Sequence, residues 1–275
     1  MRPYLCKIAY NMTGETAEAE DIVQDVLAQW LQRENAAVEN AKAYLARMTV
    51  NASIDRLNRL KAERELYTGP WLPEPYITTA PEQDLPDIEY GLLFLLERLN
   101  PLERAVFILR ESFGEDYDAI AEITGQKPDN CRQLLHRSRE KLKHGTAKPA
   151  DSEKLKALTE AFLFALHQQN REALEGILKQ DIVVYSDGGG KRWAALKPVA
   201  GLEKVLKFLF GIQQHNAQQQ TELRYEPACF NGWPAALLYH TANGEIDAAI
   251  TLMYDEEGIS ELLFMRNPDK LKVRR

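Results

Sequence analysis

The sequence lacks the features of several protein classes. No uninterrupted apolar run approaches the roughly 18 residues that a membrane-spanning helix needs. The N-terminus is no secretory signal peptide, because its short apolar run soon meets acidic residues. Only three cysteines occur, without a Cys-x-x-Cys pair, and the five histidines show no metal-ligand spacing. We therefore expect a cytoplasmic protein with reduced thiols and no membrane, metal or cofactor, and we exclude a disulfide scaffold.

The chain also lacks an overall positive charge. Its net charge of −7 argues against a protein that coats nucleic acid through bulk charge. The charges are segregated, however: residues 15–25 carry five acidic and no basic side chains, whereas residues 42–64 sum to +4 and residues 128–144 to +3. Two basic segments on an acidic chain are compatible with nucleic-acid binding at two places. Two solvated helix faces are the alternative.

The 275 residues predict about two domains at roughly 150 residues each, and the patterns divide the chain further. Residues 1–66 and 87–145 have helical periodicity. Residues 67–86 contain five prolines, which exclude a long helix or a central strand. Aromatic side chains in this linker lead us to expect that it docks on a surface. Residues 146–275 contain helices followed by hairpin strands, which predict a mostly antiparallel α+β domain.

Residues 117–142 have the pattern of a helix-turn-helix. Ala121 is small where the two helices cross, Gly125 occupies the turn, and Cys131 and Leu134 face inward. An ordinary helical hairpin is the alternative. We expect the second helix to present side chains that reach base edges and phosphates, namely Lys127, Asn130, Arg132, Gln133, His136 and Arg137.

Both helical blocks resemble a known family. The segments AEAEDIVQDVLAQWL and AKAYLARMTVNASIDRLNRLKAE resemble region 2 of bacterial sigma-70-type initiation factors, and LLERLNPLERAVFILRESFGEDYDAIAEITG with the following basic helix resembles region 4. With no other sigma region between them, this is the extracytoplasmic-function (ECF) arrangement. Similar proteins usually carry several more residues before the first helix, so we expect either a shortened first turn or a start further upstream.

Three short motifs narrow the resemblance. WLPEP at 71–75, DGGGK at 187–191 and NPDKL at 267–271 are similar to those of the ECF subgroup with a fused SnoaL-like domain. The implied fold is two all-α sigma domains, the second with a helix-turn-helix, joined by a Pro-rich linker, plus a C-terminal α+β SnoaL-like cone. The implied parts are region 2 at 1–66, the linker at 67–86, region 4 at 87–145 and the SnoaL-like domain at 146–275.

The resemblance implies a sigma factor that is no enzyme and whose partners are bacterial core RNA polymerase and promoter DNA. The polymerase-binding residues would be Glu20, Asp21, Gln24 and Asp25. The minus-ten element would be bound by Arg47, Asn51, Arg56 and Arg59. The six residues of the basic helix given above would read the minus-thirty-five element. A helix-turn-helix regulator with a ligand-binding or catalytic SnoaL-like domain is the alternative function.

The fused domain is expected to regulate in cis, in place of a separate anti-sigma protein. The glycine loop is alternatively an anion site, and an unknown small ligand or signalling partner could act at the domain. For a catalytic domain, the residues expected near a pocket are Tyr185, Asp187, Trp193, His240 and Arg266. The expected regulatory residues are Trp71, Leu72, Pro73, Glu74, Pro75, Asp187, Gly188, Gly189, Gly190, Lys191, Asn267, Pro268, Asp269, Lys270 and Leu271.

Overall fold

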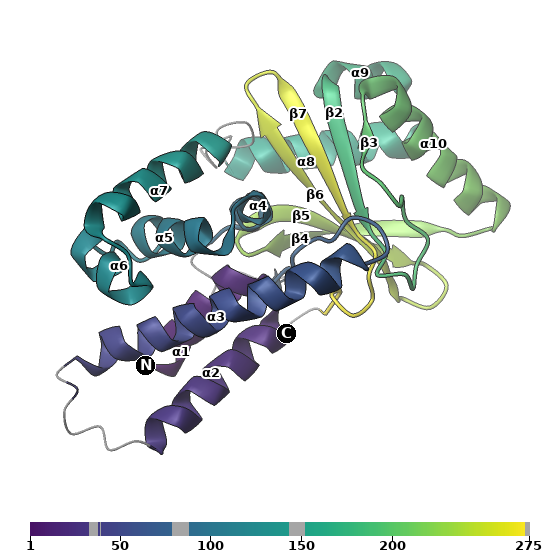
Figure 1. Cartoon of the computed structure of the whole chain (residues 1–275). Helices are drawn as coiled ribbons and strands as arrows, with labels where there is room; N and C mark the ends of the chain where they lie inside the picture. Colours follow the sequence, from purple (N-terminus) through teal and green to yellow (C-terminus); the bar gives the residue numbers. More distant parts are fainter. Residues whose placement is uncertain (33–37, 39, 79–87, 143–151, 273–275) are drawn as a thin grey trace. The chain divides into compact units, whose positions relative to one another are not determined.

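The computed structural model describes residues 1–32, 38, 40–78, 88–142 and 152–272 (Figure 1). The chain forms two compact units. The first consists of Met1–Leu66, Pro86–Ile88 and Leu92–His144, and the second of Tyr67–Leu85, Glu89–Gly91 and Gly145–Arg275. Within the described ranges, no helix combines the length and the apolar character needed to cross a membrane.

The first half of the helical unit is a three-helix bundle. Local sequence signals mark where its helices begin and end. Gly14, at φ +70°, ends the first helix. The Asn40 side chain caps the third helix by accepting a hydrogen bond from the Ala43 amide at 3.1 Å. Leu5, Val23 and Val50 are fully buried between the helices. The helices are α1 (Arg2–Thr13), α2 (Thr16–Leu31) and α3 (Ala41–Glu65).

The second half of this unit carries the predicted helix-turn-helix. Asn100 forms a capping box with Glu103 at the start of the long helix of this half. Gly125 ends the next helix at φ +69°, a backbone conformation that an L side chain rarely adopts. The elements are α4 (Tyr90–Leu95), the short 3-10 helix η1 (Leu96–Arg98), α5 (Pro101–Glu111), α6 (Tyr117–Thr124) and α7 (Pro128–Leu142).

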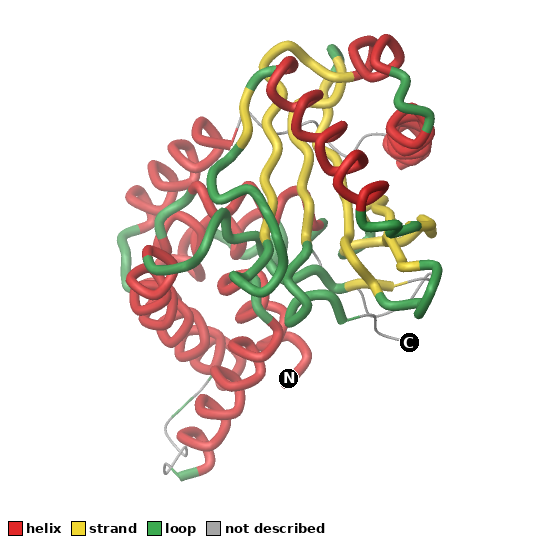
Figure 2. The backbone as a smooth tube through the Cα atoms, turned by 90° about the vertical axis from the view of Figure 1, so that its right-hand side faces the viewer, coloured by secondary structure: helices red, strands yellow, loops and turns green. Residues whose placement is uncertain are grey.

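The second unit is a mixed sheet flanked by helices, seen from the side in Figure 2. Helix α8 packs against strands β5 and β6, and α10 packs against β2 and β3. The sheet order is β1-β4-β5-β6-β7-β2-β3, antiparallel except between β2 and β7. This confirms the predicted α+β cone fold. The elements are β1 (Ile77–Thr78), α8 (Ser152–His167), α9 (Arg171–Ile177), β2 (Leu178–Asp187), β3 (Val199–Ala200), α10 (Leu202–Gln218), β4 (Leu223–Phe230), β5 (Trp233–His240), β6 (Ile246–Asp255) and β7 (Gly258–Met265).

The linker belongs to the second unit. Strand β1 pairs with β4, and Asn231 accepts a hydrogen bond from the Tyr76 amide at 2.8 Å and returns one to its carbonyl at 3.0 Å. The expectation of a docked linker is confirmed. A strand in this segment was not predicted, and it is tolerated because it is two residues long, contains no proline and lies at the sheet edge.

Candidate functional sites

The acidic face of α2 lies opposite its buried face. Ile22, Val23 and Val26 pack into the bundle. The four side chains predicted to bind polymerase are all exposed, and their spacing along the helix places them on one side. They are Glu20, Asp21, Gln24 and Asp25.

The basic residues of α3 do not share one environment. Arg47, Asn51 and Arg59 are exposed at four- and eight-residue spacings, so they lie along one stripe of the helix. Arg56 instead makes a two-point ion pair with Glu18 of α2. The Arg56 hydrogen bond is the main cause that holds the pKa of the Glu18 carboxyl below its ordinary value. The donors of Arg56 are therefore used within the protein.

A groove of about 610 Å³ runs between α2 and α3. Asp21 and Asp25 line one side of it, and Asn51 and Arg59 line the other. The acidic side contains residues predicted to bind polymerase, and the basic side contains residues predicted to bind DNA. The two sets face one another, so any phosphate bound by the basic side would also meet the acidic field of α2.

Helix α7 presents a polar face as expected. Gln133, His136 and Arg137 are exposed, while Cys131 and Leu134 are buried. Lys127 is exposed in the turn before α7, so its placement on the helix was wrong.

Two other predicted base-reading side chains already have partners. Asn130 is half-buried and donates to the Gln126 side chain at 2.7 Å. The Arg132 guanidinium is bound to Asp129 at 2.5 Å and lies 4.8 Å from the Tyr117 ring centre. The Arg132–Asp129 pair is exposed to solvent, whereas Asn130 is partly covered.

Helix α7 is fixed to α5 through Glu103. Lys141 donates to the Glu103 carboxylate at 2.7 Å. Burial on its own would raise the pKa of Glu103, but the Lys141 hydrogen bond and the capped Asn100 amide keep that pKa below its ordinary value. The basic helix therefore has a fixed orientation on its scaffold.

A cluster missed by sequence reasoning joins the first three helices to the second half of the unit. Arg104 is 2% exposed and donates to the Asn11 carbonyl at 3.0 Å. Glu97 accepts from both Arg104 and Arg64, the latter at 2.5 Å. Residues 64 and 97 lie far apart in the sequence, so no local pattern signals their pairing.

The three short motifs meet at Asp187, whose side chain is fully buried. It accepts hydrogen bonds from the Tyr67 hydroxyl at 2.5 Å, from the Leu72 amide at 3.0 Å and from the Gly189 amide at 3.0 Å. Lys270 completes the site with an ion pair at 2.8 Å. One carboxylate thus binds the linker, the glycine loop and the C-terminal tail.

Lys270 and Asn267 join the tail to the linker. The Lys270 ammonium also donates to the Leu72 carbonyl at 2.6 Å and lies 4.1 Å from the centre of the Trp71 ring. Asn267 donates to the Tyr67 hydroxyl at 3.0 Å. Tyr67 was missed by sequence reasoning, although it lies only four residues before the WLPEP motif.

The glycine loop is shaped by this contact. A Cβ on Gly189 would come within 2.5 Å of the Asn267 side chain, and one on Gly188 within 2.3 Å of the Arg192 carbonyl. The amides of Gly189, Lys191 and Arg192 all bond within the loop. This use of the amide donors favours the regulatory-loop interpretation over an anion site.

The remaining motif residues lie around this centre. Pro73 and Pro75 are buried, and the Pro73 carbonyl accepts from the Tyr90 hydroxyl at 2.9 Å. Lys191 pairs with Asp269 at the surface. Four other residues of the motifs are less buried than Asp187: Glu74 and Leu271 are half-buried, and Gly190 and Pro268 are exposed.

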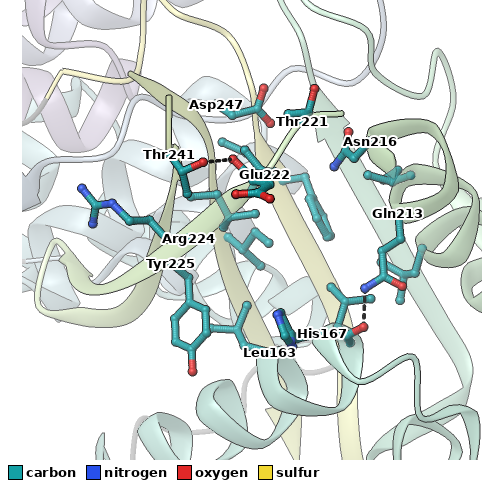
Figure 3. A pocket seen from close by; sticks show the side chains of 18 of the residues that line it. Leu163, His167, Gln213, Asn216, Thr221, Glu222, Arg224, Tyr225, Thr241 and Asp247 are labelled. Carbon is teal, nitrogen blue, oxygen red and sulfur yellow. Dashed lines mark hydrogen bonds between the residues drawn. The ribbon is translucent and has the colours of Figure 1, made fainter. Parts of the chain in front are cut away.

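The second unit also contains a cavity of about 490 Å³ (Figure 3). Arg266 lines it and makes two hydrogen bonds to Asp247, at 2.8 and 3.0 Å. His240 lies 3.3 Å from the same carboxylate. Of the five residues predicted near a pocket, only Arg266 lines this cavity; Tyr185, Asp187, Trp193 and His240 do not. Asp247 was missed, and in the described ranges no three potential metal ligands gather.

Comparison with known proteins identifies two sigma-factor regions in the chain. The chain matches "Sigma-70 region 2" over residues 1–63 and "Sigma-70, region 4" over residues 91–142. It is 30% identical to the ECF RNA polymerase sigma factor SigJ of Mycobacterium tuberculosis H37Rv, covering 90% of this chain and 78% of that protein. It is 27% identical to the probable ECF RNA polymerase sigma factor SigI of the same strain, covering 98% and 92%.

A solved structure matches the whole arrangement of elements. The crystal structure of the Mycobacterium tuberculosis extracytoplasmic function sigma factor SigJ aligns with a TM-score of 0.73 at 26% sequence identity. The alignment covers 98% of this chain and 95% of that one. The similarity therefore extends through the linker and the C-terminal α+β unit.

Proposed function

The chain belongs to the extracytoplasmic-function RNA polymerase sigma factors, and we propose how its residues divide the tasks of that family. A sigma factor binds core polymerase and directs it to promoter DNA, and it is not an enzyme. The exposed acidic face of α2 binds a basic surface of polymerase. Its charges attract that surface and repel the DNA backbone, which gives the contact its specificity.

The two basic surfaces read the two promoter elements. Gln133 and His136 of α7 contact bases of the minus-thirty-five element, and Arg137 contacts phosphate. Arg47, Asn51 and Arg59 on the stripe of α3 contact the minus-ten element. Arg56 joins them only after it leaves Glu18, and Asn130 and Arg132 likewise need new partners.

The isolated chain binds DNA weakly, because the acidic side of the α2–α3 groove opposes phosphate. Fluorescence anisotropy with a labelled promoter fragment tests this, alone and with core polymerase. Tight binding by the isolated chain that resists salt would contradict the assignment, since phosphate contacts make affinity strongly salt-dependent.

The C-terminal unit controls transcription in cis, and the buried Asp187 carboxylate is the observation that carries this proposal. It holds the segment that joins regions 2 and 4 through Tyr67 and the Leu72 amide. Because the unit is tethered to that segment, its effective concentration is about millimolar, so even a weak contact is populated. The docked linker restricts how regions 2 and 4 are presented to polymerase.

In vitro transcription with core polymerase tests this control. We expect truncation after about residue 150 to change promoter-dependent transcription strongly, in either direction. Removing only residues 267–275 takes away Asn267 and Lys270 and should change it in the same direction. The exposed ion-pair variant Asp269→Asn is the matched control and should transcribe like the full chain. Unchanged transcription by both truncations would refute regulation in cis.

The C-terminal unit acts by binding rather than by catalysis. Its cavity carboxylate, Asp247, accepts two hydrogen bonds from one nitrogen of the Arg266 guanidinium, so both carboxylate oxygens already have a partner within the protein. The protein works in the cytoplasm, where polymerase and promoters are found. Co-fractionation with polymerase tests this location.

A further inference from the structure

The cavity of the C-terminal unit has the size and lining of a small-molecule site. Its volume of about 490 Å³ falls within the range of roughly 300–1,000 Å³ that such sites occupy. Helices α8 and α10 and strands β4 to β7 contribute its walls. Asp247 and Thr221 lie at one end and Leu163 and His167 at the other in Figure 3. The apolar wall includes Leu163, Leu209, Ile212, Leu238, Ile250 and Phe264.

The charged groups at the cavity neutralise one another. Asp247 pairs with Arg266, and Arg224 pairs with Glu226 on the neighbouring surface. Glu222 is exposed to solvent. Since the buried charges are already paired, a charged ligand would lose its hydration without gaining a free counter-ion. The cavity therefore favours an uncharged molecule.

Two buried polar atoms at the wall lack a hydrogen-bond partner among the described residues. They are the Oε1 acceptor of Gln213 and the Nε–H donor of Arg266. The other end of the Gln213 amide is fixed, because it donates to the Leu166 carbonyl. An unmet buried acceptor and donor are costly, and a ligand hydroxyl or carbonyl group would satisfy them.

Arg266 also links the cavity to the Asp187 site. Its amide donates to the Asp187 carbonyl at 2.7 Å, and its guanidinium donates to the Trp193 carbonyl at 2.7 Å. The next residue, Asn267, bonds to Tyr67 of the linker. Arg266 therefore contacts the cavity, the backbone of Asp187 and the segment that follows the glycine loop.

We propose that this cavity binds an uncharged, largely apolar molecule bearing hydroxyl or carbonyl groups, and that Arg266 couples its occupancy to the docked linker. The binding site stands independently of the proposed function. The coupling rests on the proposed function, because the coupling assumes that the linker is the regulated element. The ligand acts as a signal because it binds the protein more tightly when the linker is in one arrangement than in the other.

Binding is tested on the full chain with prodan, an uncharged naphthalene ketone whose emission shifts in apolar surroundings. We expect saturable binding to one site. Ile212→Trp fills the cavity and should weaken binding by about tenfold or more, whereas Gln214→Trp, on the exposed side of the same helix, should leave it within about twofold. The anionic probe anilinonaphthalene sulfonate should bind more weakly than prodan. Equal binding by Ile212→Trp and Gln214→Trp, or tighter binding of the anionic probe, would overturn the site.

Coupling is tested by fluorine NMR of the full chain labelled with 5-fluorotryptophan. Prodan should shift the Trp71 resonance, assigned with Trp71→Phe. Asn267→Ala removes the hydrogen bond from the tail to Tyr67 without changing a residue that lines the cavity, so this variant should bind prodan and no longer shift Trp71. A Trp71 resonance unmoved in the unmodified chain would overturn the coupling alone. The transcription assay of the truncated chains separately decides the proposed function.

Discussion

Replacing Asp187 by asparagine should release the linker from the C-terminal unit. The asparagine amide keeps the shape of the carboxylate but removes its charge and replaces one acceptor by a donor. The side chain is surrounded by four donors, from Tyr67, Leu72, Gly189 and Lys270. Whichever way the amide turns, its NH2 group faces donors, and Lys270 loses its buried counter-ion.

The magnitude follows from the burial of this pair. Removing one partner of a buried ion pair costs about 3–5 kcal/mol. The lower end applies here, because Lys270 keeps the Leu72 carbonyl and the Trp71 ring as partners. A loss of about 3 kcal/mol corresponds to a change of about a hundredfold in an opening equilibrium.

Hydrogen exchange at the Leu72 amide measures this directly, because that amide donates to Asp187. Mass spectrometry of a peptide spanning the linker should show exchange about a hundredfold faster in Asp187→Asn. Asp269→Asn breaks a surface ion pair and should change exchange by less than about fivefold. The double variant Asp187→Asn with Lys270→Met should lose less free energy of linker docking than the sum of the losses in the two single variants. Exchange in Asp187→Asn equal to that of Asp269→Asn would refute the reasoning.

Three further variants test the helical unit. Arg56 holds the pKa of Glu18 below its ordinary value, so their ion pair should stabilise the protein at neutral pH and lose that effect as the pH falls through the lowered pKa. Glu18→Gln should therefore lower the free energy of unfolding in urea at neutral pH. In acid the variant and the unmodified protein should be equally stable. Arg104→Met removes the donor to the Asn11 carbonyl and one of the two partners of Glu97, which keeps Arg64, so it should cost about 1–3 kcal/mol in denaturant unfolding, and an unchanged stability would contradict a stabilising role for Arg104. Arg137→Ala should lower the salt slope of promoter binding by the polymerase complex by about one, and an unchanged slope would argue against a phosphate contact.

Local signals were enough to predict the helices of the first unit. The capping box at Asn100 and the left-handed Gly125 depend on residues within a few positions of each other, so the sequence contains the whole signal. The hairpin strands of the second unit were predicted for the same reason, since each hairpin is formed by residues close together in the sequence. The two-residue strands β1 and β3 were missed, because they depend on pairing with distant segments.

The sites were predicted less completely, because they depend on contacts across long sequence separations. The three motifs were expected to act together, but nothing in the sequence indicates that Asp187 lies at their centre or that Tyr67 takes part. Arg56 has the composition of a DNA contact, and only the fold reveals that Glu18, 38 residues away, occupies it. The cavity acid Asp247 was missed because its surroundings in the sequence are apolar.

The linker is attached to the C-terminal unit at more than one point. We expect this attachment to determine how far apart on DNA the two ends of the linker can act. A free segment of about 20 residues would extend to roughly 70 Å. Here residues 67–78 lie against the C-terminal unit, where β1 pairs with β4. The Tyr90 hydroxyl also donates a hydrogen bond to the Pro73 carbonyl. We therefore expect the separation of the two proposed promoter-reading surfaces to be set by folded contacts, including the Arg64–Glu97 pair within the helical unit, rather than by chain length. Promoter spacing, more than promoter sequence, is the property that we expect undocking the linker to relax.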